Sequence, residues 1–224
     1  MSQQQWTAVD TYFTEQLHLS DAVLDAAIRA NAAAKLPAID VSPSQGRFLH
    51  LLARICGARK ILEIGTLGGY STIWLARALP PDGRLISLEF NAAHAEIAGS
   101  NIRNAGLSDR VEIRVGAALN SLPLLAKENI APFDFIFIDA DKPNNPGYLQ
   151  WAIKLSRPGT LIIVDNVVRD GAIADAASTD PSIQGTREMF AMISREPRLS
   201  ATALQTVGAK GYDGFAMALV TAGK

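Results

Sequence analysis

Between residues 60 and 164 the chain alternates short apolar runs with longer amphipathic segments, and this alternation constrains the fold most. It predicts a parallel sheet with helices on both faces, because parallel neighbours need crossover connections. We therefore expect an α/β fold with a mostly parallel seven-stranded sheet. The five expected parallel strands are Lys60–Ile64, Leu85–Glu89, Val111–Val115, Phe135–Ile138 and Leu161–Val164.

Helices are expected between and after these strands, at Tyr70–Leu79, Asn91–Asn104, Ala117–Lys127, Asn145–Leu155 and roughly Ile183–Arg195. Two final segments rich in apolar residues or β-formers, Ser200–Val207 and Gly214–Val220, are joined by a glycine-rich stretch. This pair predicts an antiparallel hairpin at the edge of the sheet, a common addition to a parallel sheet.

The first 42 residues read as short amphipathic helices, and Pro37 closes that region. Ser42-Pro43-Ser44-Gln45 then has the spacing of a capping box and predicts the start of a helix that ends at Gly57. A length of 224 residues suits one domain. We expect residues 1–42 to form a helical extension and residues 43–224 to form a Rossmann-like core.

The composition excludes several classes of protein. A net charge of -1 gives no basic footprint for nucleic acid, and no apolar run is long enough to span a membrane. The N-terminus lacks the pattern of a signal peptide, so a cytoplasmic location is expected. The single cysteine, Cys56, excludes an internal disulfide and lies in an apolar run, which predicts a buried structural thiol.

The segment FDFIFIDADK combines a buried strand with a charged end. Phe135–Ile138 is apolar without alternation, and Asp139, Asp141 and Lys142 follow it directly. Ligands of open α/β sheets bind beyond the carboxyl ends of the strands, so these charges are placed for chemistry. We expect a cofactor, a metal ion and a substrate to meet there; Asp141 has no assigned chemistry and is expected to order the turn.

The next strand end carries Asp165 and Asn166. Neighbouring strands lie about 4.8 Å apart, so these side chains can approach Asp139. Two carboxylates and an amide oxygen suit Mg²⁺ rather than zinc. The alternative is that each aspartate caps a turn. Lys142, in the same loop, is a candidate general base next to such a cation, although a lone loop lysine is usually only solvated.

A glycine-rich turn follows the first strand, in the segment ILEIGTLGGYST. Its glycines allow a ligand to approach the backbone, and Glu89, at the end of the second strand, can accept hydrogen bonds from ribose hydroxyls. Leu67 occupies the position of the second glycine of a dinucleotide fingerprint, and Glu63 would repel a diphosphate. The turn therefore favours S-adenosylmethionine over NAD, without excluding NAD. Ala117 is a small residue beside which an adenine could lie, or it could simply allow close packing at the start of a helix.

These motifs resemble the cation-dependent catechol and caffeoyl-CoA-like O-methyltransferases. The matching segments begin at SPSQGRFLHLLARICGARKILEIGTLGGYST and include FDFIFIDADK, LIIVDNVV and GAKGYDGFAMAL. The resemblance implies the Rossmann-like class I methyltransferase fold, a small phenolic substrate and, commonly, a homodimer. Two departures, PNNPGY after Lys142 and a GAAL turn without the usual aspartate, leave the substrate open.

The resemblance also implies roles for individual residues. S-adenosylmethionine would be bound by Glu63, Gly65, Gly69, Ser71, Glu89, Ala117 and Asp139. Mg²⁺, or another divalent cation such as Mn²⁺ or Ca²⁺, would be held by Asp139, Asp165 and Asn166. Lys142 would take the proton from a catechol hydroxyl, with Asp139 and Asn166 completing the catalytic set. Two alternatives stay open: an NAD-dependent oxidoreductase on the same core, and a catalytically silent cofactor-binding partner subunit.

Overall fold

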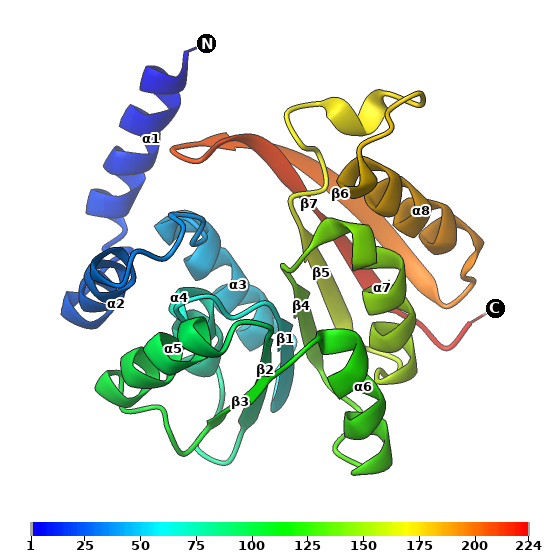
Figure 1. The fold of residues 1–224 in the computed structure, drawn as a ribbon, viewed down its shortest axis with the longest axis horizontal. Coiled ribbons are helices and arrows are strands. Elements are labelled where there is room, and N and C mark those ends of the chain that lie inside the picture. The colour runs from blue at the N-terminus through cyan, green and yellow to red at the C-terminus, as the bar shows by residue number, and fades with distance from the viewer. Residues whose placement is uncertain (1, 224) are drawn as a thin grey trace.

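Within residues 2–223, which the computed structural model describes, seven strands form one sheet between two layers of helices (Figure 1). The strand order is β3-β2-β1-β4-β5-β7-β6. Strands β1 to β5 pair in parallel, and β7 pairs antiparallel with both β5 and β6. The strands are β1 (Lys60–Ile64), β2 (Arg84–Glu89), β3 (Val111–Val115), β4 (Phe135–Ile138), β5 (Leu161–Asp165), β6 (Leu199–Gly208) and β7 (Gly211–Val220).

The helices confirm the predicted order and differ from it only at their ends. The helix expected to run to Leu79 ends at Ala76, and the last helix begins earlier, at Pro181, after the N-cap Asp180. The helices are α1 (Gln3–Gln16), α2 (Ala22–Ala33), α3 (Pro43–Ile55), α4 (Tyr70–Ala76), α5 (Ala92–Asn104), α6 (Ala118–Lys127), α7 (Asn145–Lys154) and α8 (Pro181–Arg195), with short 3-10 turns η1 (Lys142–Asn144) and η2 (Ala172–Ala174).

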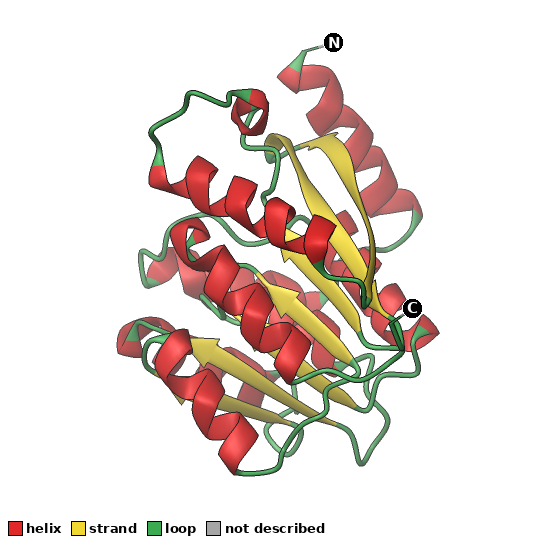
Figure 2. Cartoon of the chain, turned by 90° about the vertical axis from the view of Figure 1, so that its right-hand side faces the viewer, coloured by secondary structure: helices red, strands yellow, loops and turns green. Residues whose placement is uncertain are grey.

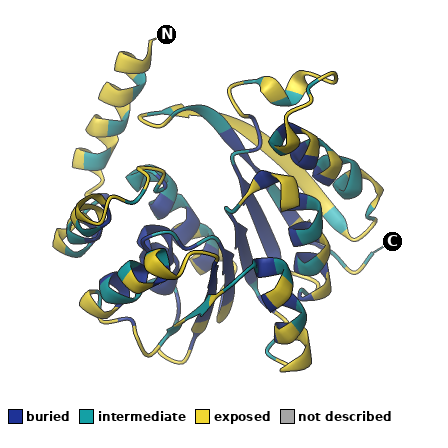
Figure 3. Ribbon diagram, viewed as in Figure 1, coloured by how far each residue is buried: buried dark blue, intermediate teal, exposed yellow. Residues whose placement is uncertain are grey.

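Strand β4 lies at the centre of the sheet and is buried on both faces. Phe135 and Phe137 pack into the core under α3, α4 and α5, whereas Ile136 and Ile138 pack into the core under α6, α7 and α8. Figures 2 and 3 show the helices on the two faces of the sheet and the buried strands between them. Burying one such side chain contributes roughly 1.5–3 kcal/mol. The two cores therefore fix β4, and with it the position of the charged residues that follow.

The N-terminal extension contacts the core at two places. Helix α1 has no buried residue; the side chain of Gln3 donates to the carbonyl of Gly208 (2.9 Å), and Asp10 accepts from the amide of Ala209 (2.7 Å). Figure 1 accordingly draws α1 beside the tip of the β6–β7 hairpin. Helix α2 is anchored more firmly, since it buries Leu24, Ala27 and Asn31. No helix within residues 2–223 has the length and apolar character needed to cross a membrane.

The prediction that Cys56 is buried is wrong, because its side chain is exposed. Helix α3 ends at Ile55, and Cys56 is its C-cap. The apolar run around it is only partly a core face: Leu51 is 49% exposed and Ile55 is 79% exposed. The buried face of the helix consists of Gly46, Leu49, His50 and Ala53.

Candidate functional site

A cavity of about 630 Å³ opens beyond the carboxyl ends of β1, β4 and β5, where an α/β sheet is expected to bind its ligands. Its floor includes Gly65, Asp139 and Asp165, each at or just after a strand end. The segment of residues 37–41, which precedes α3, forms another part of its wall. The loops near residues 37–43, 143–148 and 168–180 all contribute residues to this lining.

A second cavity of about 500 Å³ adjoins the first, since both are lined by Gly65 and Glu89. Its walls are largely apolar and include Phe90, Ala117 and Leu119. Ala117, the small residue expected beside an adenine, thus lines this apolar cavity. Phe90 was not predicted; it is 79% exposed, and such an exposed aromatic next to an apolar cavity offers a surface on which a planar base could stack.

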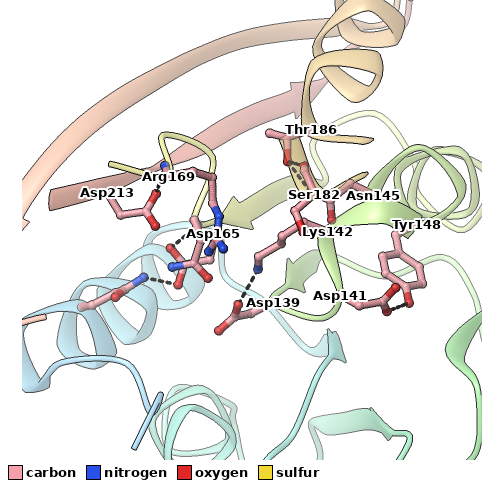
Figure 4. A network of polar contacts seen from close by, with 12 residues as sticks. Asp139, Asp141, Lys142, Asn145, Tyr148, Asp165, Arg169, Ser182, Thr186 and Asp213 are labelled. Carbon is pink, nitrogen blue, oxygen red and sulfur yellow. Dashed lines mark hydrogen bonds and ion pairs between the residues drawn. The ribbon is translucent and has the colours of Figure 1, made fainter. Parts of the chain in front are cut away.

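The predicted carboxylates and lysine meet at the floor of the first cavity (Figure 4). Lys142 is only 7% exposed, and its Nζ donates to Oδ1 of Asp139 at 2.8 Å. Asp165 is 5% exposed; its Oδ2 accepts from the side chain of Gln45 (2.7 Å) and its Oδ1 from the amide of Asn166 (2.9 Å). Burial, together with the negative charge of Asp139, raises the pKa of Asp165 to about 7.

The donor set at this point fits a hard divalent cation. Asn166, held at a φ of +54°, lines the cavity together with Asp139 and Asp165, so the three predicted ligands face one space. Within residues 2–223 no group of three His, Cys, Asp or Glu side chains is arranged to hold a metal, and the donor set here combines two carboxylates with an amide. The half-buried carboxylate of Asp139, the buried carboxylate of Asp165 and the amide oxygen of Asn166 are oxygen ligands of the kind that suits Mg²⁺.

The turn that carries Lys142 is ordered by Asp141. Its carboxylate accepts hydrogen bonds from the hydroxyl of Tyr148 and the side chain of Asn144. These contacts fix the start of η1 and α7, which follow β4 directly. The prediction that Asp141 orders the turn therefore agrees with its contacts.

The glycine-rich turn packs directly on the end of β4. Gly65 has a φ of +103°, and a Cβ at this position would lie 2.1 Å from the carbonyl oxygen of Asp139. The carboxylate of Glu89 accepts from the amides of Thr66 (3.1 Å) and Leu67 (2.8 Å). The turn thus holds Glu89 at the boundary of the two cavities, where it can accept hydroxyl donors from a ligand.

Glu63 and Gly69, two of the predicted cofactor-binding residues, line neither cavity, and their contact with the cofactor stays a prediction. Glu63 is fully buried, and its carboxylate accepts from the hydroxyl groups of Ser71 (2.6 Å), Thr72 and Ser87. Burial raises the pKa of Glu63 to about 7, despite these donors. Ser71 does line the cavity and is held there by its hydrogen bond to Glu63, and Gly69 is the N-cap residue of α4.

A buried amide network links the extension to the glycine-rich turn, and the sequence did not predict it. Asn101 of α5 donates from its side chain to the carbonyl of Gly68 (2.8 Å) and to Oδ1 of Asn31 (3.0 Å). Asn31 in turn donates to Asp40 (2.8 Å), which belongs to the cavity wall. The N-terminal segment therefore covers the site through specific hydrogen bonds.

Gln45 is a second residue whose role was missed. Its backbone amide donates to the hydroxyl of Ser42 at 3.2 Å, as the capping-box spacing predicts. The side chain, however, does not complete the capping box and instead reaches Asp165. Only the fold brings these two residues together.

The buried carboxyl of Glu63 generates a prediction about stability and pH. Its pKa is raised from 4.5 to about 7 in the folded protein, so the folded state holds a proton that the unfolded state releases. The free energy of unfolding should therefore fall by about 3 kcal/mol between pH 4.5 and 7 from this group alone.

Denaturant unfolding of the cofactor-free protein and of Glu63→Gln, at pH 5 and pH 8, measures this difference. The variant should lose stability less steeply as the pH rises, because glutamine does not titrate. Identical pH dependence in the two proteins would contradict the assignment. The comparison subtracts the contribution of other groups, including Asp165.

Comparison with known proteins agrees with this geometry. Residues 15–219 match the family described as O-methyltransferase. The catechol O-methyltransferase of Niastella koreensis is 54% identical over 98% of this chain and 100% of its own. The O-methyltransferase of Bacillus cereus, solved in complex with SAH, is 60% identical with a TM-score of 0.97, covering 98% of this chain and 100% of its own.

A third relative is TomG from Streptomyces achromogenes, an O-methyltransferase solved in complex with SAM. It is 51% identical with a TM-score of 0.96, and the alignment covers 99% of each chain. None of these relatives is an oxidoreductase, so the alternative of an NAD-dependent enzyme has no support among them. The fold, the family match and these full-length relatives lead to one conclusion: the chain belongs to the O-methyltransferase family, and it is an O-methyltransferase.

Proposed function

We propose that this enzyme transfers the methyl group of S-adenosylmethionine to one hydroxyl of a small catechol-like aromatic, and that a divalent cation is required. The observation that carries the proposal is the set of buried Asp165, buried Lys142 and half-buried Asp139, which lines one cavity next to a second, apolar cavity. The relatives named catechol O-methyltransferase support the same substrate class.

The two adjoining cavities suggest how the cofactor lies. Glu89 would accept the ribose hydroxyls, with Ala117 and Phe90 beside the base in the apolar cavity. Gly65 and Ser71 would face the amino-acid part at the floor of the larger cavity. When bound, S-adenosylmethionine supplies an electrophilic methyl group. The relatives solved with SAM or SAH support this cofactor.

Asp139, Asp165 and Asn166 would hold the cation, since all three line the larger cavity. A divalent cation there would supply Lewis acidity that makes a catechol hydroxyl a stronger acid. Lys142 would then accept the hydroxyl proton at Nζ. The ion pair with Asp139 at 2.8 Å holds Nζ at the cavity floor, beside the proposed cation ligands.

A homodimer is a further proposal, supported by the exposed apolar side chains of α1. Tyr12, Phe13 and Leu17 are 59%, 45% and 61% exposed, and Leu204 and Val207 of the neighbouring hairpin are about half exposed. A partner subunit would cover an apolar surface of this kind. Sedimentation velocity would contradict the proposal if the protein remained monomeric at micromolar concentration.

The proposed reaction predicts that the enzyme methylates members of a panel of catechols with S-adenosylmethionine in the presence of Mg²⁺. Detection of the methyl ether product measures this activity. Excess EDTA should reduce the rate at least about 100-fold, because the hydroxyl is then hardly ionised near neutral pH. Addition of excess Mg²⁺ should restore activity. Full activity in EDTA would contradict the role of the cation, and no turnover of any catechol would favour a catalytically silent subunit.

The role of Lys142 predicts a loss of turnover without a loss of cofactor binding. Lys142→Ala should lower kcat by roughly 10²–10⁴, the usual contribution of a general base. Lys142→Arg is the matched variant, since it keeps a positive charge beside Asp139 but cannot give up its proton near neutral pH. Steady-state kinetics and calorimetry with S-adenosylmethionine measure the two effects. Turnover close to wild type in the arginine variant would remove Lys142 from the base role.

A further inference from the structure

One exposed basic side chain of the larger cavity has no hydrogen-bonding or ion-pair partner among residues 2–223. Arg169, in the loop after β5, lines the cavity together with Asp165 and Asn166. In Figure 4 its side chain extends from the loop toward the region of Asp165. Within residues 2–223 the guanidinium group forms no ion pair and no hydrogen bond; only the backbone amide of Arg169 is bonded, to Asp213 (2.9 Å).

The other basic side chains of this cavity each have at least one polar partner, and for His94 this is Glu89, with 3.6 Å between Nδ1 and Oε1. Lys142 is paired with Asp139 at 2.8 Å. Lys210, at the turn of the β6–β7 hairpin, donates to the carbonyl of Ala38 (3.1 Å) and lies near the carboxylate of Asp40. Arg169 is therefore the basic residue left to receive an anionic group from a ligand.

The backbone holds Arg169 in a conformation that arginine seldom adopts. Its φ is +55° and that of Asp170 is +54°, both in the left-handed region. The carboxylate of Asp213 in the GYDG motif secures this loop by accepting from the amides of Val168, Arg169 and Gly214, each at 2.9 Å. Such unfavourable conformations persist where surrounding contacts over-determine them, and they concentrate at functional sites.

We propose that Arg169 binds a carboxylate carried by the catechol-like substrate, so that the enzyme prefers acidic catechols to neutral ones. A guanidinium group offers two parallel N–H donors that match a carboxylate. The position suits this role, because Arg169 and the proposed cation ligands Asp165 and Asn166 line one cavity. The inference rests on the proposed function, since it assumes that the two hydroxyl groups bind at the cavity floor.

The test compares 3,4-dihydroxybenzoate, which carries a carboxylate, with unsubstituted catechol as methyl acceptors. Arg169→Asn removes the charge while favouring the left-handed backbone, so the loop should keep its conformation. We expect kcat/KM for the acid to fall roughly 10- to 100-fold, mainly through KM. For catechol, kcat/KM should change less than about threefold. Arg169→Lys should recover part of the loss for the acid.

Lys127→Gln is the control, because this exposed lysine at the end of α6 lines neither cavity. Unchanged kinetics with both substrates in Arg169→Asn, or an equal loss with both, would overturn the inference and leave the methyltransferase assignment intact. If the wild-type enzyme turned over neither acceptor, the proposed function would fail first, and the inference with it.

Discussion

The ion pair between Lys142 and Asp139, next to the buried Asp165, is the interaction on which the rest of the site depends. Charged groups are removed from water only where partners compensate the loss of hydration. Here the ammonium of Lys142 pairs with Asp139, whereas Asp165 accepts hydrogen bonds from Gln45 and the amide of Asn166, and burial raises the pKa of Asp165 to about 7. The protein keeps this unfavourable arrangement because β4 and β5 are fixed by cores on both faces of the sheet.

The loops around this charge cluster pack closely against the strand ends. Gly65 lies so near the carbonyl of Asp139 that no side chain could replace its hydrogen, and Asn166 and Arg169 adopt left-handed conformations. The same loops present the proposed cation ligand and the proposed carboxylate receptor. The amides of Asn31 and Asn101 then connect the cover of the cavity to the glycine-rich turn. The proposed cofactor, cation and acceptor sites are thus parts of one hydrogen-bonded framework.

Much of this framework could be predicted from local sequence, but contacts between residues far apart in the chain could not. The parallel strands and the convergence of Asp139, Asp165 and Asn166 follow from apolar runs and from the geometry of parallel sheets. Gln45 and Asp165 are 120 positions apart, so no local pattern announces their contact. Residue type alone also did not reveal that Glu63 acts behind the cavity wall. Cys56 was misjudged because an apolar run at a helix end need not face the core.

The central claim is that the carboxylates at the ends of β4 and β5 form a cation site. Titration of the protein with Mn²⁺, followed by electron paramagnetic resonance, tests it most directly. We expect one saturable site in the wild type and in Asp109→Asn, which replaces an exposed acid that lines neither cavity. Asp165→Asn and Asp139→Asn should each weaken binding roughly 10-fold or more. Equal affinity in all four proteins, or no saturable site in the wild type, would contradict the account.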